Sequence, residues 1–158
     1  MEIRRVLADE WSALRDVRLR ALAEAPYAFG TRYDEARERP ERWWIEWAAR
    51  SCEGDGQAFF VAWDDEDPVG IAGTYLEDDG QRWLISMWTE PAFRARGVGR
   101  ALVGAVVAFA RSAGSSELFL EVAQGNEAAR ALYERCGFVA TGNGSRADLQ
   151  TTNMRLSL

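Results

Sequence analysis

The chain has 158 residues, of which 47% are apolar and 28% charged, and its formal net charge at neutral pH is −6. This size and balance are typical of a single globular domain, here residues 1–158, and exclude a disordered chain. The acidic balance and the lack of a basic stripe argue against nucleic-acid binding, and no apolar run approaches the length that spans a membrane.

Two residue types that carry much enzyme chemistry are missing. The sequence has no histidine, and all 19 of its basic residues are arginine. These absences exclude a histidine triad, a histidine-ligated metal and a catalytic lysine, so a general base has to be a carboxylate, a tyrosine, a thiolate or a relayed water. We expect no metal cofactor. The two cysteines imply no disulfide framework, and residues 1–5 lack the apolar core of a signal peptide, so we expect a cytoplasmic protein.

The first fifty residues are mainly helical by pattern. Residues 3–7 predict a short strand, and the apolar periodicity of residues 9–24 predicts an amphipathic helix. A further helical stretch at residues 34–39 stops at Pro40, which suits the first turn of another helix that runs to residue 50.

Three antiparallel strands are predicted next, at residues 57–63, 69–76 and 83–88, and acidic turns join them. Side chains alternate between the two faces of a strand. In the third strand this period predicts one face with Trp83, Ile85 and Met87 and another with Leu84, Ser86 and Trp88.

The segment Arg94-Ala95-Arg96-Gly97-Val98-Gly99-Arg100 follows the third strand and leads into a helix predicted at residues 98–110. Free N–H groups at a helix start carry partial positive charge and favour phosphate. Glycine allows the backbone to approach a ligand closely, and arginine adds bidentate donors. The segment therefore predicts a binding site for a phosphorylated small molecule.

Other interpretations of this turn are possible. A dinucleotide site requires a small residue where Leu102 stands, and a P-loop requires Lys-Ser or Lys-Thr where Arg100-Ala101 stands, so both are disfavoured. A tight turn that binds nothing is the structural alternative.

The remaining elements follow a strand–helix–strand passage, which favours a parallel step between residues 83–88 and the buried strand predicted at residues 118–123. Asn126 suits the N-cap of a short helix that ends at Cys136, with Gly137 beyond its end.

The last strands are predicted at residues 138–141 and 153–158, with a flexible hairpin loop at residues 142–147. No internal repeat and no interdomain linker are visible in the sequence.

Two motifs together carry a family resemblance. The Phe93-Arg94-x-x-Gly97-x-Gly99 turn is followed by Leu120-x-Val122, by Asn126, and by Ala129-x-x-Leu132-Tyr133-x-x-x-Gly137-Phe138. In order and spacing these motifs resemble the GNAT family of acetyl-CoA-dependent N-acetyltransferases. The match covers residues 87–141.

The resemblance implies an α/β (α+β) single-domain GNAT fold. Its mixed, mostly antiparallel sheet has about seven strands, is splayed between strands 83–89 and 118–123, and is flanked by about four to five helices. Acetyl-CoA, the co-substrate, would lie in the splay. The pantetheine arm would pair with the backbone of Met87, Trp88 and Thr89. The pyrophosphate would lie on the turn formed by Arg94, Ala95, Arg96, Gly97, Val98, Gly99 and Arg100.

Tyr133 has two interpretations. It packs the short helix on the sheet, or, as the resemblance implies, it donates a proton to the departing CoA thiolate. Asn126 lies seven residues earlier on the same helix face, where capping and cofactor contact are compatible.

Glu121 is the leading candidate for the base that deprotonates the acceptor amine, directly or through water. In some family members, notably those that act on the N-terminus of a ribosomal protein, the matching glutamate has this role. The alternative is a charged residue on a solvent-facing side of the strand. Glu90 and the acidic turns at residues 64–66 and 78–79 compete more weakly.

The resemblance implies an N-acetyltransferase whose acceptor is a primary amine, and the acidic balance favours a small cationic amine. A protein N-terminus and a lysine side chain are alternative acceptors, and a non-catalytic acyl-CoA-binding module is an alternative function.

An aromatic patch is predicted at Trp43, Trp44 and Trp47. We expect at least one of these side chains to pack in the core, and an exposed one could line an acceptor pocket. Phe29 is a similar candidate for the pocket. We interpret Cys136 as packing. The sequence leaves the oligomeric state open, with a homodimer as one expectation.

Overall fold

The computed structural model describes residues 1–26, 31–146 and 148–158. The strands are β1 (Glu2–Arg5), β2 (Gln57–Asp64), β3 (Asp67–Leu76), β4 (Arg82–Thr89), β5 (Glu117–Ala123), β6 (Val139–Arg146) and β7 (Leu149–Ser157). The helices are α1 (Trp11–Glu24), α2 (Tyr33–Arg37), α3 (Glu41–Cys52), α4 (Val98–Ser112) and α5 (Glu127–Arg135).

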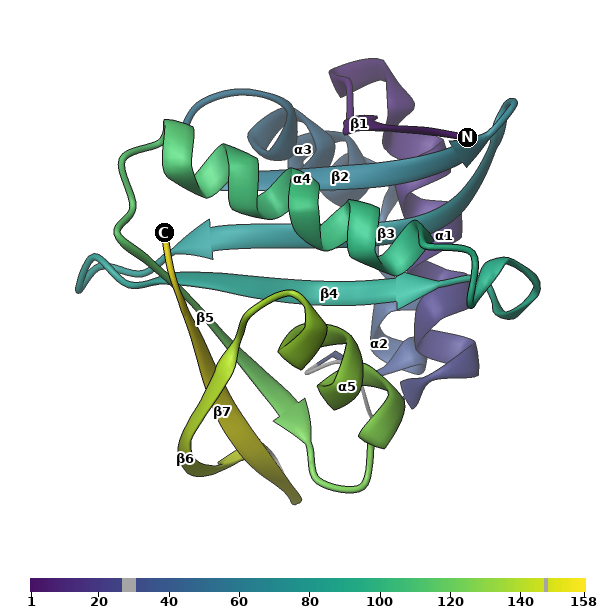
Figure 1. Ribbon diagram of the computed structural model, residues 1–158. Helices are drawn as coiled ribbons and strands as arrows, with labels where there is room; N and C mark the ends of the chain where they lie inside the picture. Colours follow the sequence, from purple (N-terminus) through teal and green to yellow (C-terminus); the bar gives the residue numbers. More distant parts are fainter. Residues whose placement is uncertain (27–30, 147) are drawn as a thin grey trace.

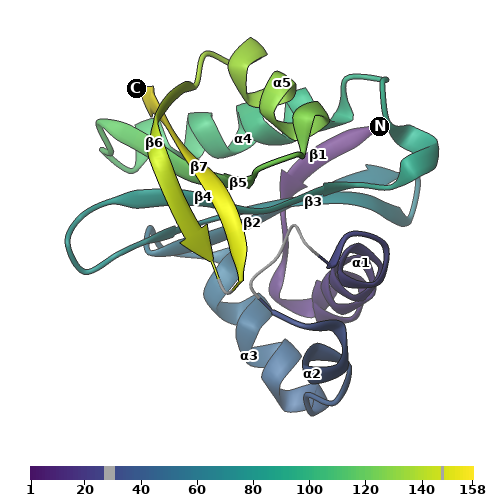
Figure 2. The same ribbon diagram turned by 90° about the horizontal axis from the view of Figure 1, so that it is seen from below.

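One seven-stranded sheet organises the molecule, with the strand order β1-β2-β3-β4-β5-β7-β6. Helices α4 and α5 cover one face of the sheet, and α1, α2 and α3 cover the other (Figure 1; Figure 2). The mixed, mostly antiparallel sheet with helices on both faces is confirmed. None of the helices in the described ranges is long and apolar enough to cross a membrane.

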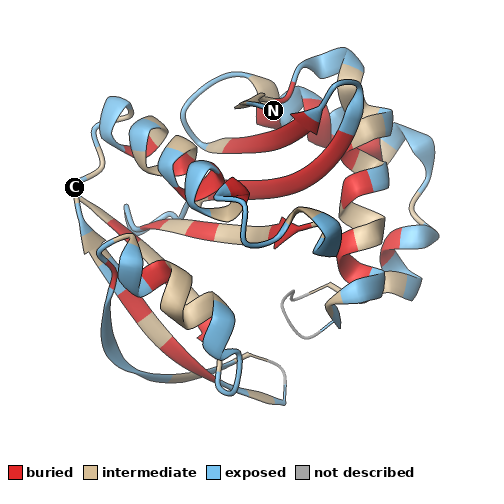
Figure 3. Cartoon of the chain, turned by 45° about the vertical axis from the view of Figure 1, so that its right-hand side comes forward, coloured by how far each residue is buried: buried red, intermediate tan, exposed pale blue. Residues whose placement is uncertain are grey.

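Each face of the sheet has its own apolar core. On the α4 face, Leu102, Val106 and Leu118 are fully buried. On the α1 face, Trp44 and Phe59 are fully or almost fully buried. The core on the α4 face is continuous across the splay, because it includes Leu84 of β4 as well as Leu118 of β5. Buried residues lie on strands on both sides of the splay (Figure 3).

Strand β4 carries a β-bulge at its centre. Its residues Ser86 and Met87 stand opposite a single residue of β3, and Ser86 has a φ of 56°. Leu84 and Met87 therefore pack on the α4 face, whereas Ile85 and Trp88 pack on the α1 face. The predicted alternation is wrong beyond Ser86, because the extra residue shifts the period of two.

The parallel step is confirmed, and it is short. Strands β4 and β5 share one backbone pair, Trp83 with Phe119, and then diverge (Figure 3). On its other side β5 pairs with β7 over its whole length. The splay predicted between the fourth and fifth strands is therefore present.

The chain beyond β5 differs from the prediction in one respect. Residues 142–146 belong to β6, which pairs with β7 up to Arg146 opposite Leu149. The predicted flexible loop at residues 142–147 is therefore wrong for residues 142–146, and residue 147 lies outside the described residues. Gly142 and Gly144 are poor strand formers, and backbone pairing with β7 overrides that propensity.

Two glycine substitutions should have opposite effects on stability. A Cβ at Gly73 would lie 2.4 Å from the Phe59 ring, so we expect Gly73→Ala to lower the free energy of unfolding by about 1–3 kcal/mol. A Cβ at Gly104, in α4, would meet nothing within 4 Å, so Gly104→Ala should raise it by about 0.5–1 kcal/mol. Urea unfolding measures both, and shifts in the same direction would contradict the described packing.

Candidate active site

The cleft between β4 and β5 has a volume of about 1010 Å³. Small-molecule sites measure roughly 300–1,000 Å³, so this cleft suits a large ligand. Beyond Trp83 no residue of β4 pairs with β5 within the described ranges, and residues 84–89 line the cleft along this free edge. An extended polar ligand can therefore form backbone hydrogen bonds with β4, as a further strand would.

The turn before α4 offers unpaired donors at one end of the cleft. Within the described chain, none of the backbone N–H groups of residues 95–100 has a hydrogen-bond partner. Ala95 and Gly97 have positive φ values of 60° and 84°, and Gly97 is the N-cap residue of α4. These N–H groups and the α4 dipole can bind an anion, and they lie at the position where the sequence predicts an anion site.

Gly99 has a packing role in this turn. A Cβ on it would lie 3.1 Å from Leu132 of α5 and 3.3 Å from Met87 of β4. The glycine therefore allows the first turn of α4 to pack against both elements at once.

The residues of the predicted turn do not all face the cleft. Arg94, Ala95, Gly97, Gly99 and Arg100 line it. Two others do not: the Val98 side chain is buried in the core, and the Arg96 guanidinium stacks 5.3 Å from the centre of the Phe93 ring.

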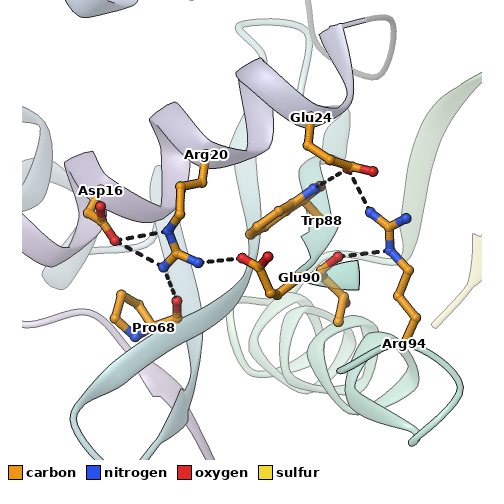
Figure 4. A network of polar contacts seen from close by, with 8 residues as sticks. Asp16, Arg20, Glu24, Pro68, Trp88, Glu90 and Arg94 are labelled. Atoms are coloured by element: carbon orange, nitrogen blue, oxygen red, sulfur yellow. Dashed lines mark hydrogen bonds and ion pairs between the residues drawn. The ribbon is translucent and has the colours of Figure 1, made fainter. Parts of the chain in front are cut away.

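The guanidinium of Arg94 turns toward α1 (Figure 4). It donates to Glu24 Oε2 at 2.7 Å and to the Thr89 carbonyl at 2.9 Å. Trp88 Nε1 donates to the same Glu24 oxygen at 2.8 Å, and with Arg94 it holds the pKa of Glu24 below its ordinary value. This geometry gives the Arg94 side chain a role in holding the turn against α1, and the role predicted for it in anion binding stays a prediction.

A second ion pair lies beside this one. Arg20 of α1 bonds to Glu90, to Asp16 and to the Pro68 carbonyl (Figure 4). The Glu90 carboxylate is thereby engaged in holding α1 to the end of β4, and Glu90 does not line the cleft. It is therefore a poor general base.

Tyr133 projects from α5 into the cleft, although its side chain is 6% exposed and contacts the Phe138 ring edge-on. Its hydroxyl has no hydrogen-bond partner among the described residues. Burial raises its pKa, and the neighbouring Cys136 thiol group adds to that effect. The packing and donor interpretations are therefore compatible, because the ring is packed and the phenol keeps its proton at neutral pH.

Glu121 lies on β5 between the buried residues Leu120 and Val122, so its side chain faces the α1 side of the sheet and lines the cleft. The Thr151 hydroxyl donates to Glu121 Oε2 at 3.4 Å. This long hydrogen bond leaves acceptor capacity on the carboxylate for a second donor.

Asn126 and Cys136 mark the two ends of α5. The Asn126 Oδ1 accepts a hydrogen bond from the Ala129 N–H at 3.2 Å, which confirms the predicted cap, and its amide also lines the cleft. Cys136 is half-buried against the core, and burial raises the pKa of its thiol. Packing is thus the role that the structure gives it.

The predicted aromatic patch on α3 does not reach the cleft. Trp44 and Trp47 are buried, and Trp43 stacks against both of them and under Arg39. None of the three lines the cleft, so the expectation of an acceptor-pocket tryptophan on α3 is wrong. The other candidate, Phe29, lies outside the described residues.

The sequence analysis did not single out several polar residues that line the cleft, among them Arg18 of α1, Tyr75 of β3 and Arg146 of β6. Arg18 is one helical turn before Leu22, a spacing that predicts burial of that face. Nothing in the local sequence of Tyr75 or Arg146 distinguishes it from a surface residue, since only the sheet order brings these strands to the cleft.

This fold and cleft can be compared with known proteins. A family model described as Acetyltransferase (GNAT) family matches residues 14–138. The match covers most of the chain, and the chain therefore belongs to the GNAT acetyltransferase family.

Individual relatives agree with this assignment. Human N-acetyltransferase 8 is 35% identical over 92 residues, which cover 55% of this chain and 40% of that protein. Streptothricin acetyltransferase of Streptomyces lavendulae is 33% identical over 95 residues, covering 60% and 50%. The chain thus spans about half or less of the length of these relatives. The yncA acetyltransferase of Salmonella typhimurium, solved with acetyl-CoA, has the same fold with a TM-score of 0.80 at 21% identity, covering 100% of this chain and 94% of that one.

Proposed function

We propose that this protein is an N-acetyltransferase that moves the acetyl group of acetyl-CoA to a primary amine. The observation that carries the proposal is the cleft, in which a row of unpaired N–H groups, a free β4 edge and a protonated phenol meet. The proposal treats residues 1–158 as one catalytic domain. A cytoplasmic location and a homodimer stay predictions.

The residues present fit acetyl-CoA. The N–H groups of residues 95–100, with Arg100 and Arg135 beside them, would hold the diphosphate. The free edge at Met87, Trp88 and Thr89 would pair with the amides of the pantetheine arm. When bound, acetyl-CoA supplies a thioester carbonyl to the amine.

Two side chains would move the protons of this reaction. Glu121 would accept a proton from the ammonium group of the acceptor, directly or through water, so that the free amine can attack. The N–H groups of the β4 bulge would stabilise the negative charge on the carbonyl oxygen. Tyr133 would donate its proton to the sulfur as the C–S bond breaks. Because burial holds the phenol neutral, the proton is available at neutral pH.

The second candidate is a non-catalytic acyl-CoA-binding module. It would need the anion site and the free β4 edge but neither Glu121 nor Tyr133. The presence of both groups on the walls of one cleft favours the enzyme. The acceptor would be a small amine, with a protein N-terminus and a lysine side chain as the other candidates.

Release of free CoA thiol tests the proposal. Purified protein with acetyl-CoA and a panel of small amines, amino acids, peptides with free N-termini and lysine peptides should release thiol at a rate that depends on the amine. Binding of CoA with no thiol release from any of these acceptors would favour the binding module. No binding of CoA would refute both.

Arg100 should contribute to cofactor affinity through its charge. We expect Arg100→Gln to weaken CoA binding roughly tenfold, and added salt should reduce the difference from wild type, because screening weakens exposed ion pairs. Isothermal titration calorimetry measures the Kd. Arg111→Gln on the same helix is the control, since Arg111 does not line the cleft. Equal Kd values for wild type and Arg100→Gln would place the diphosphate elsewhere.

A further inference from the structure

The charges that line the cleft do not follow the net charge of the chain. The chain has a formal net charge of −6, yet the charged residues that line the cleft are five arginines and two glutamates. Glu24 and Arg94 form an ion pair with each other. Gly99 of α4 packs against Leu132 of α5, so Arg100 and Arg135 lie at the end of the cleft that has the unpaired N–H groups. The charged side chains that remain along the rest of the cleft are those of Arg18, Arg146 and Glu121.

Arg18 lies at the β4 bulge. Its Nη1 donates to the Ser86 hydroxyl at 2.7 Å, and its guanidinium is 6.0 Å from the centre of the Trp47 ring. Burial lowers its pKa to about 10, and the charge of Arg39 acts in the same direction. The guanidinium is thus a half-buried cation on the wall of the cleft, and it can donate to an anion on a ligand.

Arg146 reaches the same region from β6. Gly144 is opposite Thr151, and Thr151 is opposite Ala123, so Arg146 stands on the face of the sheet that carries Glu121. Arg146 lines the same cleft as Tyr133 and Glu121. Its Nε is buried and has no hydrogen-bond partner in the part of the chain that the structure describes. A ligand acceptor would satisfy that donor.

Glu121 and an aromatic surface also line the cleft. Burial and a hydrogen bond to Glu77 raise the pKa of Tyr75 to about 12, and the charge of Glu121 acts in the same direction. Tyr75 is opposite Trp83 across the strand pair, and Trp83 packs 5.6 Å from Phe119. The region thus offers one carboxylate for an ammonium group, two guanidinium groups for an anion, and an apolar surface.

We propose that the acceptor is an amine that also carries a carboxylate, as an α-amino acid does. Arg18 and Arg146 bind the carboxylate, and Glu121 receives the ammonium group. This inference rests on the proposed function and narrows its acceptor class, since an amine without an anion would leave the buried Arg146 Nε without an acceptor among the described residues. A protein N-terminus is disfavoured, because its α-carboxyl group is an amide.

Matched acceptors test the inference. Glycine, leucine and phenylalanine are each compared with their amides and with the amine that lacks the carboxyl group, using CoA thiol release. We expect kcat/KM for at least one amino acid to exceed that of its amide by roughly tenfold to a hundredfold, the usual range for a charged hydrogen bond. The α-amine of an amino-acid amide has a lower pKa than that of the amino acid, so more of it is deprotonated at neutral pH, and a larger supply of free amine does not explain this order. An amide or plain amine that reacts as fast as its amino acid would overturn the inference.

Variants of the two arginines test whether these side chains cause the preference for an amino acid over its amide. Arg146→Gln and Arg18→Gln should each reduce the ratio of amino acid to amide at least about fivefold, mainly through KM for the amino acid. Arg18→Lys, which keeps the charge, should retain part of the ratio. Arg111→Gln should leave it unchanged. Arg146 is half-exposed, so its variant decides the point even where the Arg18 variants do not fold. An unchanged ratio in Arg146→Gln and in folded Arg18→Gln would contradict the assignment.

Different results would refute the carboxylate site and the acetyl transfer itself. Thiol release with amines or peptides but not with amino acids would refute the carboxylate site alone. If no acceptor releases thiol, isothermal titration calorimetry with the CoA-loaded protein still tests the carboxylate site, because it compares the binding of an amino acid with that of its amide. Phenylalanine that binds more tightly than phenylalaninamide would support the site, and equal or weaker binding would refute it.

Discussion

Replacement of Tyr133 by phenylalanine should lower kcat by roughly 10²-fold to 10⁴-fold and leave the Kd for CoA unchanged. The ring is buried and would stay packed against Phe138, so only the proton donor is removed. Since burial raises the pKa of this phenol, the wild-type rate should show no loss through its ionisation up to a pH of about 10. Initial rates of thiol release across pH measure both effects.

Tyr33→Phe is the matched control, because Tyr33 lies on α2 and does not line the cleft. It should keep both kcat and the Kd for CoA. A Tyr133→Phe variant with normal turnover would contradict the donor role, and one that binds CoA poorly would show that the hydroxyl serves binding instead.

Replacement of Glu121 by glutamine should lower kcat/KM for the amine at neutral pH by roughly 10²-fold or more. Glutamine keeps the size of the side chain and a hydrogen-bond acceptor for Thr151, but it cannot take the proton of the ammonium group. As pH rises toward the pKa of the acceptor amine, more of that amine is already neutral. The difference between variant and wild type should therefore shrink with rising pH.

Glu117→Gln provides the comparison on the same strand. Glu117 lies on the same face of β5 as Glu121, pairs with Arg155 at 3.3 Å and does not line the cleft. Its variant should turn over at the wild-type rate. A loss in Glu121→Gln that stays constant across pH would show that the carboxylate positions the acceptor and that another group, or water alone, takes the proton.

Local sequence signals predicted the elements that depend on local chemistry. Gly97 before α4, Asn126 at the start of α5 and Gly137 after its end were predicted from capping and turn rules, which involve only neighbouring residues. The splay between β4 and β5 came from the family resemblance. The strand–helix–strand order supports it, because it favours a parallel pair.

Features that depend on pairing between distant strands were not predictable from local patterns. The bulge at Ser86 is visible only in the register against β3, so the faces of β4 were assigned wrongly. Gly142 and Gly144 suggested a loop, yet pairing with β7 extends β6 through them. Likewise, Arg146 has no local signal of function, and the sheet order alone brings it to the cleft.

The contacts of charged side chains were not predictable from local patterns. The motif predicts Arg94 in the anion site, and the structure adds an ion pair with Glu24, seventy positions earlier. The net charge of −6 led to the expectation of a cationic acceptor, which stays a prediction, whereas most of the charged residues that line the cleft are arginines. Overall charge describes the whole surface, and it says little about a site that buries only a few of the charged side chains.

A crystal structure of the protein with CoA tests the central claim most directly. The diphosphate oxygens should lie within hydrogen-bond distance of the N–H groups of residues 95–100, and the pantetheine amides should pair with β4 at Met87 to Thr89. A CoA molecule bound outside the cleft between β4 and β5, or a diphosphate that contacts none of these N–H groups, would contradict the account.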